Sequence, residues 1–103
     1  MQSMTSTVEQ VPALVWESWR DEHDAVVLDV REPVEWARGV LPGVRRMAMS
    51  QIATDWQQLD SATPILVVCR TGNRSDTVAR ALVGAGFERV ANMAGGMVAL
   101  GLA

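Results

Sequence analysis

Two short, uninterrupted apolar runs constrain the fold of this chain more than any other feature. Ala25-Val26-Val27-Leu28 ends at Asp29, and Ile65-Leu66-Val67-Val68 ends at Cys69. Strands that are apolar on both faces are typical of a parallel sheet covered by helices on each side, because a half-exposed strand would alternate apolar with polar residues. The sequence therefore predicts an α/β fold in which both runs are buried strands.

Weaker signals predict the elements around these two strands. Further short strands are expected at Thr7–Gln10, Val44–Met49 and Arg89–Ala91. Helical segments are expected at Pro12–Trp19, Glu32–Ala37 and Thr54–Leu59, then after Ser75, where Val78, Ala81, Leu82 and Ala85 recur at helical spacing. A glycine turn and a short apolar helix follow residue 94. Strands that alternate with helices indicate a mostly parallel sheet with helices on both faces.

The length of 103 residues fits one small domain with a single modest core. We expect residues 1–6 to be a flexible N-terminus and residues 7–103 to form the domain. The N-terminus lacks the basic start and long apolar stretch of a secretory signal, and the weakly polar run 90–103 is too short and too rich in glycine to span a bilayer. These features predict a cytoplasmic protein without membrane contact.

Cys69 is the only cysteine and His23 the only histidine of the chain. A lone cysteine forms no internal disulfide and fits a reducing compartment, and one Cys with one His is too few for a cysteine/histidine zinc cluster. We therefore expect neither a metal nor a cofactor.

The charges are unevenly spread along the chain, whose formal net charge is −3. Residues 1–30 carry one Arg against six acidic residues, whereas residues 31–103 carry eight Arg against six. All nine basic residues are Arg, whose planar guanidinium donates a fixed fork of hydrogen bonds to oxyanions. No alternation of basic and aromatic residues indicates nucleic-acid binding. The basic excess around Cys69 predicts a small anionic partner.

Cys69 lies at the carboxyl end of a predicted strand, the edge at which parallel sheets bind ligands. The following segment, Arg70-Thr71-Gly72-Asn73-Arg74-Ser75, leads into a helix, and its successive N–H groups form a cradle for negative charge. This field, with Arg70 and Arg74, predicts a lowered pKa for the Cys69 thiol and thus a nucleophile. Gly72 allows close backbone approach, while Thr71, Asn73 and Ser75 can donate hydrogen bonds to a bound group.

Four pieces of the chain, in this order, resemble the rhodanese family of sulfurtransferases. They are Val27-Leu28-Asp29-Val30-Arg31-Glu32; Glu35-Trp36 with Gly39 and Leu41-Pro42-Gly43; the loop Cys69–Ser75; and Gly86-Phe87 with Asn92 and Gly95-Gly96-Met97. The resemblance implies a rhodanese-like, five-stranded parallel sheet. It also implies sulfur transfer through a Cys69 persulfide, from a donor such as thiosulfate to cyanide, a thiol or a protein acceptor. The chain departs from the family pattern at Val40, Ala48 and Leu100, which are scaffold positions.

The spacing from Cys69 to Arg74 separates sulfur transfer from a related chemistry. Cysteine-dependent phosphatases need Cys-x5-Arg to encircle a tetrahedral phosphate, whereas this chain has the shorter Cys-x4-Arg. A phosphatase or an arsenate reductase is therefore the less favoured alternative. A second alternative is a weakly catalytic or non-catalytic module that carries sulfur or binds a regulatory partner. Two arginines in the loop favour a charged donor, thiosulfate or a related thiosulfonate, over mercaptopyruvate.

Several residues near these motifs have structural as well as functional interpretations. Asp29 and Arg31, at the end of another strand, either orient the Cys69 loop or form a purely structural pair. Glu35 and Trp36 are expected to fix their short helix rather than to touch substrate. The remaining aromatic and basic side chains of note are expected to be core aromatics (Trp16, Trp19, Trp56), an exposed loop residue (His23) and a solvated pair (Arg45, Arg46).

Overall fold

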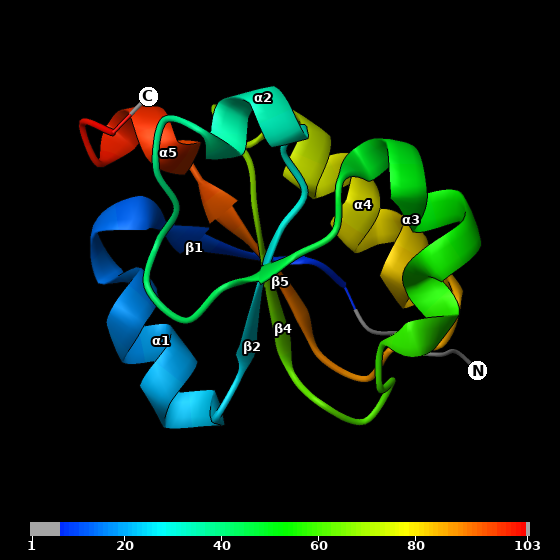
Figure 1. Cartoon of the computed structure of the whole chain (residues 1–103). Coiled ribbons are helices and arrows are strands. Elements are labelled where there is room, and N and C mark those ends of the chain that lie inside the picture. Colours follow the sequence, from blue (N-terminus) through cyan, green and yellow to red (C-terminus); the bar gives the residue numbers. More distant parts are fainter. Residues whose placement is uncertain (1–6, 103) are drawn as a thin grey trace.

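The computed structural model describes residues 7–102, so the predicted flexible segment 1–6 lies outside the described residues. Five strands form one sheet in the order β1-β5-β4-β2-β3, and every pairing is parallel (Figure 1). The strands are β1 (Glu9–Pro12), β2 (Val26–Asp29), β3 (Arg45–Arg46), β4 (Ile65–Val68) and β5 (Val90–Ala94). The predicted α/β class with a five-stranded parallel sheet is confirmed.

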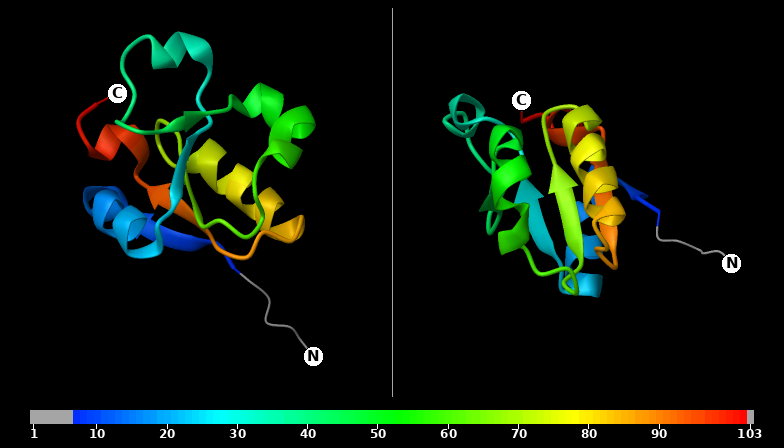
Figure 2. Two further views of the ribbon diagram at one scale, coloured as in Figure 1. Left: turned by 60° about the horizontal axis from the view of Figure 1, so that its bottom comes forward. Right: turned by 90° about the vertical axis from the view of Figure 1, so that its right-hand side faces the viewer.

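Helices cover both faces of this sheet, as the alternation of elements predicted. The helices are α1 (Trp16–His23), α2 (Pro33–Trp36), α3 (Met49–Asp55), α4 (Asn73–Gly84) and α5 (Gly96–Ala99), with one-turn 3-10 segments η1 (Ala13–Val15) and η2 (Trp56–Gln58). Figure 1 shows α3 and α4 on one side of the sheet and α1 and α5 on the other; Figure 2 gives two further views of these layers.

The central strand β4 explains why its sequence is apolar without alternation. Ile65 and Val67 pack into the core beneath α3 and α4, whereas Leu66 and Val68 pack into the core beneath α1. All four side chains are at most 2% exposed. Both faces of β4 are therefore covered, as expected of a strand in the middle of a parallel sheet.

The structure corrects two predicted boundaries near the N-terminus. Pro12 ends β1, opposite Ala94, and caps the one-turn 3-10 segment η1; the α-helix itself begins at Trp16 and continues to His23. Proline is tolerated there because β1 is an edge strand. The prediction of His23 as an exposed loop residue was wrong, since its half-buried ring closes α1 and contacts the Trp19 ring at 4.4 Å between centroids.

Two further boundaries differ in the middle of the chain. The strand predicted over Val44–Met49 shrinks to Arg45–Arg46, because this edge strand pairs only with the last two residues of β2. The helix expected at Thr54 begins at Met49, and its Ile52 packs against the core.

Other expectations for the core are confirmed. Trp16 and Trp19 are buried, and Trp56 packs against the opposite core. No helix within residues 7–102 is long and apolar enough to cross a membrane.

Candidate active site

Cys69 directly follows β4, and a short turn joins it to α4, which begins at Asn73. The start of α5 fixes this turn from the far side, because the Met97 N–H donates to the Cys69 carbonyl and the Val98 N–H donates to the Arg70 carbonyl, each at 3.0 Å. The sheet order places β4 between β2 and β5. The turn therefore sits at the carboxyl edge, among the ends of three strands.

Three donors converge on the Cys69 sulfur. The Gly72 N–H lies 3.1 Å from Sγ, the Ser75 N–H 3.3 Å and the Ser75 hydroxyl oxygen 3.2 Å. Burial raises the pKa of the Cys69 thiol, but hydrogen bonds from the Ser75 hydroxyl and from the amides of Ser75, Gly72 and Thr71 outweigh it and lower the pKa below its ordinary value. The first turn of α4 thus stabilises a thiolate, as helix N-termini do.

The Cys69 side chain is nevertheless fully out of contact with solvent. Its surroundings combine apolar core residues on one side with the amide cradle on the other.

Gly72 makes the turn possible. Its φ of +100° lies in the region that L side chains rarely adopt, and a Cβ there would stand 3.2 Å from the Gly95 amide nitrogen. The turn can pack this tightly against the end of β5 because position 72 carries no side chain.

The sequence led us to expect that Arg74 would stand free beside the thiol, but in the structure it is paired with an acidic side chain. Its two terminal nitrogens donate to the two carboxylate oxygens of Glu35, at 2.6 and 2.8 Å. Hydrogen bonding to Arg74 lowers the pKa of Glu35 to about 2, and the pair in turn raises the pKa of Arg74, with a smaller contribution from Cys69. Arg74 therefore adds positive potential near the sulfur while both of its terminal nitrogens are engaged by Glu35.

Glu35 is a residue whose place at this site the sequence did not reveal. It fixes α2 as expected, because its side chain accepts from the Glu32 N–H in a capping box. The same carboxylate anchors Arg74 of α4. The only sequence signal for this contact was an acidic residue, Glu35, on the short helix that follows β2.

Asp29 and Arg31 form a buried pair with the fork geometry of a bidentate contact. The Arg31 Nε and Nη2 donate to the Asp29 carboxylate at 2.8 to 3.1 Å, and both side chains are at most 3% exposed. Arg31 also donates to the carbonyls of Glu35 and Gly39. Of the two interpretations, the contacts favour the structural one, because Arg31 orients α2 and the segment after it rather than the Cys69 loop.

The remaining loop residues face two different hollows. Thr71, Gly72 and Asn73 line a polar cavity of about 430 Å³ together with Asn92 and Gln10. Arg70 is exposed and lines a small hollow on the other side, together with Arg31, Glu35, Arg38 and Leu102. Arg70 forms no ion pair with an acidic residue of the described chain, so its guanidinium remains available to an anion.

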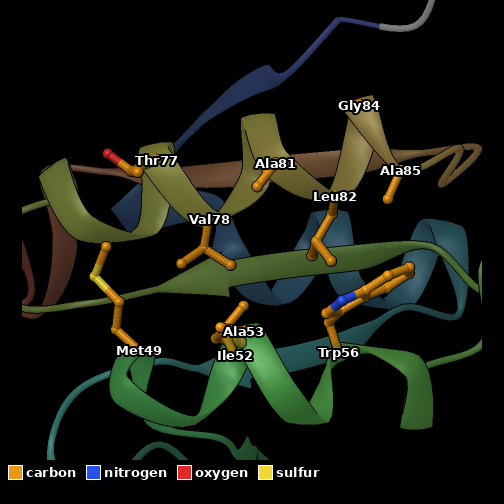
Figure 3. A pocket seen from close by; sticks show the side chains of 10 residues that line it. All are labelled: Met49, Ile52, Ala53, Trp56, Thr77, Val78, Ala81, Leu82, Gly84 and Ala85. Atoms are coloured by element: carbon orange, nitrogen blue, oxygen red, sulfur yellow. The ribbon is translucent and has the colours of Figure 1, made fainter.

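A larger hollow lies away from the sulfur. Figure 3 shows an apolar groove of about 540 Å³ between α3 and α4, lined among others by Met49, Ile52, Trp56, Val78 and Leu82. None of the residues from Cys69 to Ser75 lines it. Residues 7–102 also hold no group of three His, Cys, Asp or Glu side chains placed to bind a metal ion.

Comparison with known proteins agrees with the fold. The family model for the rhodanese-like domain matches residues 13–102. The thiosulfate sulfurtransferase GlpE of Pseudomonas putida is 39% identical over 77 residues, which cover 75% of this chain and 70% of that protein. The putative sulfur carrier protein YrkF of Bacillus subtilis is 27% identical over 90% of this chain and 52% of its own length.

A solved structure gives the same result. The crystal structure of a rhodanese-related protein from Thermoplasma volcanium superposes with a TM-score of 0.75 at 28% identity, covering 86% of each chain. The chain therefore belongs to the rhodanese-like domain family, and the resemblance seen in its sequence is confirmed.

Proposed function

We propose that this protein is a sulfurtransferase that moves a sulfane sulfur through a persulfide on Cys69. The Cys69 thiolate attacks the outer sulfur of thiosulfate, the sulfur–sulfur bond of the donor breaks, and sulfite leaves with the bonding electron pair. Cyanide, a small thiol or a cysteine of a partner protein then attacks the outer sulfur of the persulfide and restores the thiolate. Cys69 is the only cysteine, so the acceptor is external.

The observation that carries this proposal is the ring of donors around Sγ. The amides of Gly72 and Ser75 point at the sulfur although the side chain is fully buried. A structural cysteine in an apolar core has no need of such donors, whereas a nucleophilic thiolate is stabilised by them.

Arg70 supports an anionic donor. Because Glu35 occupies the fork of Arg74, Arg70 is the loop arginine whose guanidinium is left for thiosulfate or a related thiosulfonate. Thr71 and Asn73 are exposed in the separate polar cavity and can donate hydrogen bonds to a sulfur donor bound there.

The same contacts weigh against a phosphatase or an arsenate reductase. Their tetrahedral oxyanions need a loop arginine that is free to turn its guanidinium to the anion, and both terminal nitrogens of Arg74 are held by Glu35. A module that carries sulfur without useful turnover remains the second candidate, favoured by the likeness to YrkF. We place the reaction in a reducing, cytoplasmic compartment, because the lone thiol must stay reduced to act.

Intact-mass spectrometry tests the proposal. Incubation with thiosulfate under alkaline conditions without reductant should add one sulfur, about 32 Da, to the wild-type chain and nothing to Cys69→Ser. Adding cyanide should remove the extra mass and release thiocyanate.

The outcomes separate the candidates. Repeated release of thiocyanate in excess thiosulfate and cyanide indicates an enzyme, and a stable adduct with negligible turnover indicates a carrier. A wild-type chain that gains no mass contradicts both.

A further inference from the structure

The Ser75 hydroxyl lies between two groups that compete for its one hydrogen. Its oxygen is 3.2 Å from the Cys69 sulfur and 2.5 Å from Oδ1 of Asn92. A hydroxyl carries a single hydrogen and can donate it to only one of these neighbours at a time. Ser75 is fully buried and Asn92 is 3% exposed, so the hydrogen of Ser75 is shared between two protein partners.

The orientation of the Asn92 amide decides what it offers to Ser75. Its nitrogen, Nδ2, donates to the Gly72 carbonyl at 3.1 Å and to Gln10 Oε1 at 2.9 Å. Since a backbone carbonyl only accepts, the amide nitrogen must face Gly72, and the oxygen must face Ser75. Two oxygens 2.5 Å apart need a hydrogen between them, so Ser75 donates to Asn92.

The reduced thiol satisfies every member of this network. When the Ser75 hydroxyl gives its hydrogen to Asn92, the Cys69 S–H can donate in the reverse direction to the Ser75 oxygen 3.2 Å away, and Gln10 anchors the far end by donating to Asp76 at 2.8 Å. Ionisation breaks this arrangement, because the proton leaves Sγ for solvent. If Ser75 then turns its hydrogen to the thiolate, the Ser75 and Asn92 oxygens face each other with no hydrogen between them. If Ser75 keeps its hydrogen on Asn92, the thiolate has only backbone donors.

We propose that Asn92 is a positioning residue that competes with Cys69 for the Ser75 hydrogen and thereby restrains ionisation of the thiol. The inference deepens the proposed function and rests on it for its chemical use. In the persulfide, Sγ is bonded to two atoms and the negative charge lies on the outer sulfur, so the Ser75–Asn92 bond no longer opposes the charged state. Asn92 therefore favours the sulfur-loaded form over the empty thiolate.

Other charged groups surround the loop and also influence its titration. They come from the end of β2 and the turn after it, from α2, from the loop and from α4, and are Asp29, Arg31, Glu32, Glu35, Arg70, Arg74 and Asp76. Substitutions at Ser75 and Asn92 leave all of these charges in place, so a comparison of such variants isolates the hydroxyl.

The test is a pH titration of the thiolate by its ultraviolet absorbance, without any sulfur donor. Wild type is compared with Asn92→Ala, Ser75→Ala and the double variant. Asn92→Ala frees the Ser75 hydrogen for the sulfur, so the thiolate fraction at a fixed pH below the midpoint should rise about tenfold, as expected of a hydrogen bond to a charged group. The double variant should titrate like Ser75→Ala.

The size of the Ser75→Ala effect is an independent readout. Because Asn92 holds the Ser75 hydrogen for most of the time, the proposal expects Ser75→Ala to lower the thiolate fraction at a fixed pH by less than about tenfold; a tenfold or larger drop overturns the proposal. The proposal is also overturned if Asn92→Ala shifts the titration midpoint equally with and without the Ser75 hydroxyl, since the effect would then pass through the Gly72 turn. It is likewise overturned if Asn92→Ala leaves the midpoint unchanged or raises it.

A control variant separates the hydroxyl from the rest of the network. Gln10→Ala removes one contact of Asn92 but leaves Gly72 to orient its amide, so we expect little change in the titration. If Asn92→Ala fails to fold, Ser75→Ala alone decides. A chain that takes no sulfur from thiosulfate would refute the proposed function and leave this titration result standing.

Discussion

At the scale of single residues, ion pairing decides which arginines are free to act. Five of the nine guanidiniums form pairs with acidic side chains, and the pair of Arg74 with Glu35 joins residues 39 positions apart. The sequence places Arg74 beside Cys69, but nothing local announces a partner that distant. Pairing therefore changes the role of Arg74 from binding substrate to holding α2 against α4.

Glu35→Gln should make the free energy of unfolding less sensitive to a fall in pH. The folded-state pKa of Glu35, about 2, lies below the ordinary 4.5, so its stabilising effect is fully present above pH 4.5 and is lost as the pH falls toward 2. At neutral pH the variant should lose about 0.5 to 1 kcal/mol, as expected of a partly exposed pair. Denaturant unfolding near neutral pH and at roughly pH 3 measures both effects.

Glu17→Gln provides the matched control, because it removes the same charge from an exposed position on α1. The difference between wild type and Glu35→Gln should shrink at the lower pH, whereas Glu17→Gln should show little loss at either pH. An equal loss from Glu35→Gln at both values would contradict the ionic interpretation.

At the scale of elements, the start of α5 holds the turn that carries Cys69 in place. Gly96 has a φ of +60°, and a Cβ at this position would lie 2.6 Å from the Arg70 carbonyl carbon and 2.7 Å from the Cys69 carbonyl oxygen. The two N–H groups that follow, of Met97 and Val98, donate to these same carbonyls. The turn and α5 therefore form one unit, and the approach between them is possible only at a glycine.

Gly96→Ala should destabilise the protein more than Gly43→Ala. Both glycines have positive φ, but a Cβ at Gly43 would meet nothing within 4 Å. We expect about 1 to 2 kcal/mol from backbone strain at either position, and about 1 to 3 kcal/mol more at Gly96 from overpacking. Thermal and denaturant unfolding measure the difference; equal losses would show that the turn can move away from α5 without cost.

At the scale of the whole molecule, the sheet gathers positive charge at the end that carries Cys69. Arg38, Arg45, Arg46 and Arg70 form no ion pair with acidic residues of the described chain. Arg38 and Arg70 line the same hollow, and the Arg46 guanidinium lies over the Trp36 ring of α2 at 5.6 Å. Although the chain is acidic overall, an anion approaching this edge meets unpaired guanidiniums.

Arg70→Ala should slow sulfur transfer from thiosulfate by about three- to fivefold, with less effect on a neutral sulfane sulfur donor. Added salt should slow the wild type more than the variant, because it screens the charge that the variant lacks. Initial rates with both donors over a range of ionic strength measure this. Arg45→Ala removes the same charge from the edge strand β3, outside the hollow that Arg70 lines, and should slow transfer from thiosulfate less than Arg70→Ala does. Equal losses with both donors would argue against charge pairing at Arg70.

Local patterns in the chain were enough to predict the sheet, its parallel strands, the position of Cys69 and the donor loop after it. Apolar runs, glycines and the start of α4 act over a few neighbouring residues, so their effect can be read from neighbouring letters. Boundaries at edge strands were harder: β3 and Pro12 depend on how much of a partner strand is available, not on their own composition.

The residues that contact the Cys69 loop from other elements are determined by packing across the molecule, not by the local sequence. Glu35 reaches Arg74 from another helix, Asn92 reaches Ser75 from β5, and Gly96 supports the Cys69 turn from α5. These contacts form because parallel strands bring distant segments to one edge, where each buried polar group must find a donor or an acceptor. The chemistry proposed for Cys69 was visible in its neighbours along the chain, whereas the contacts proposed to tune it come in part from residues adjacent only in space.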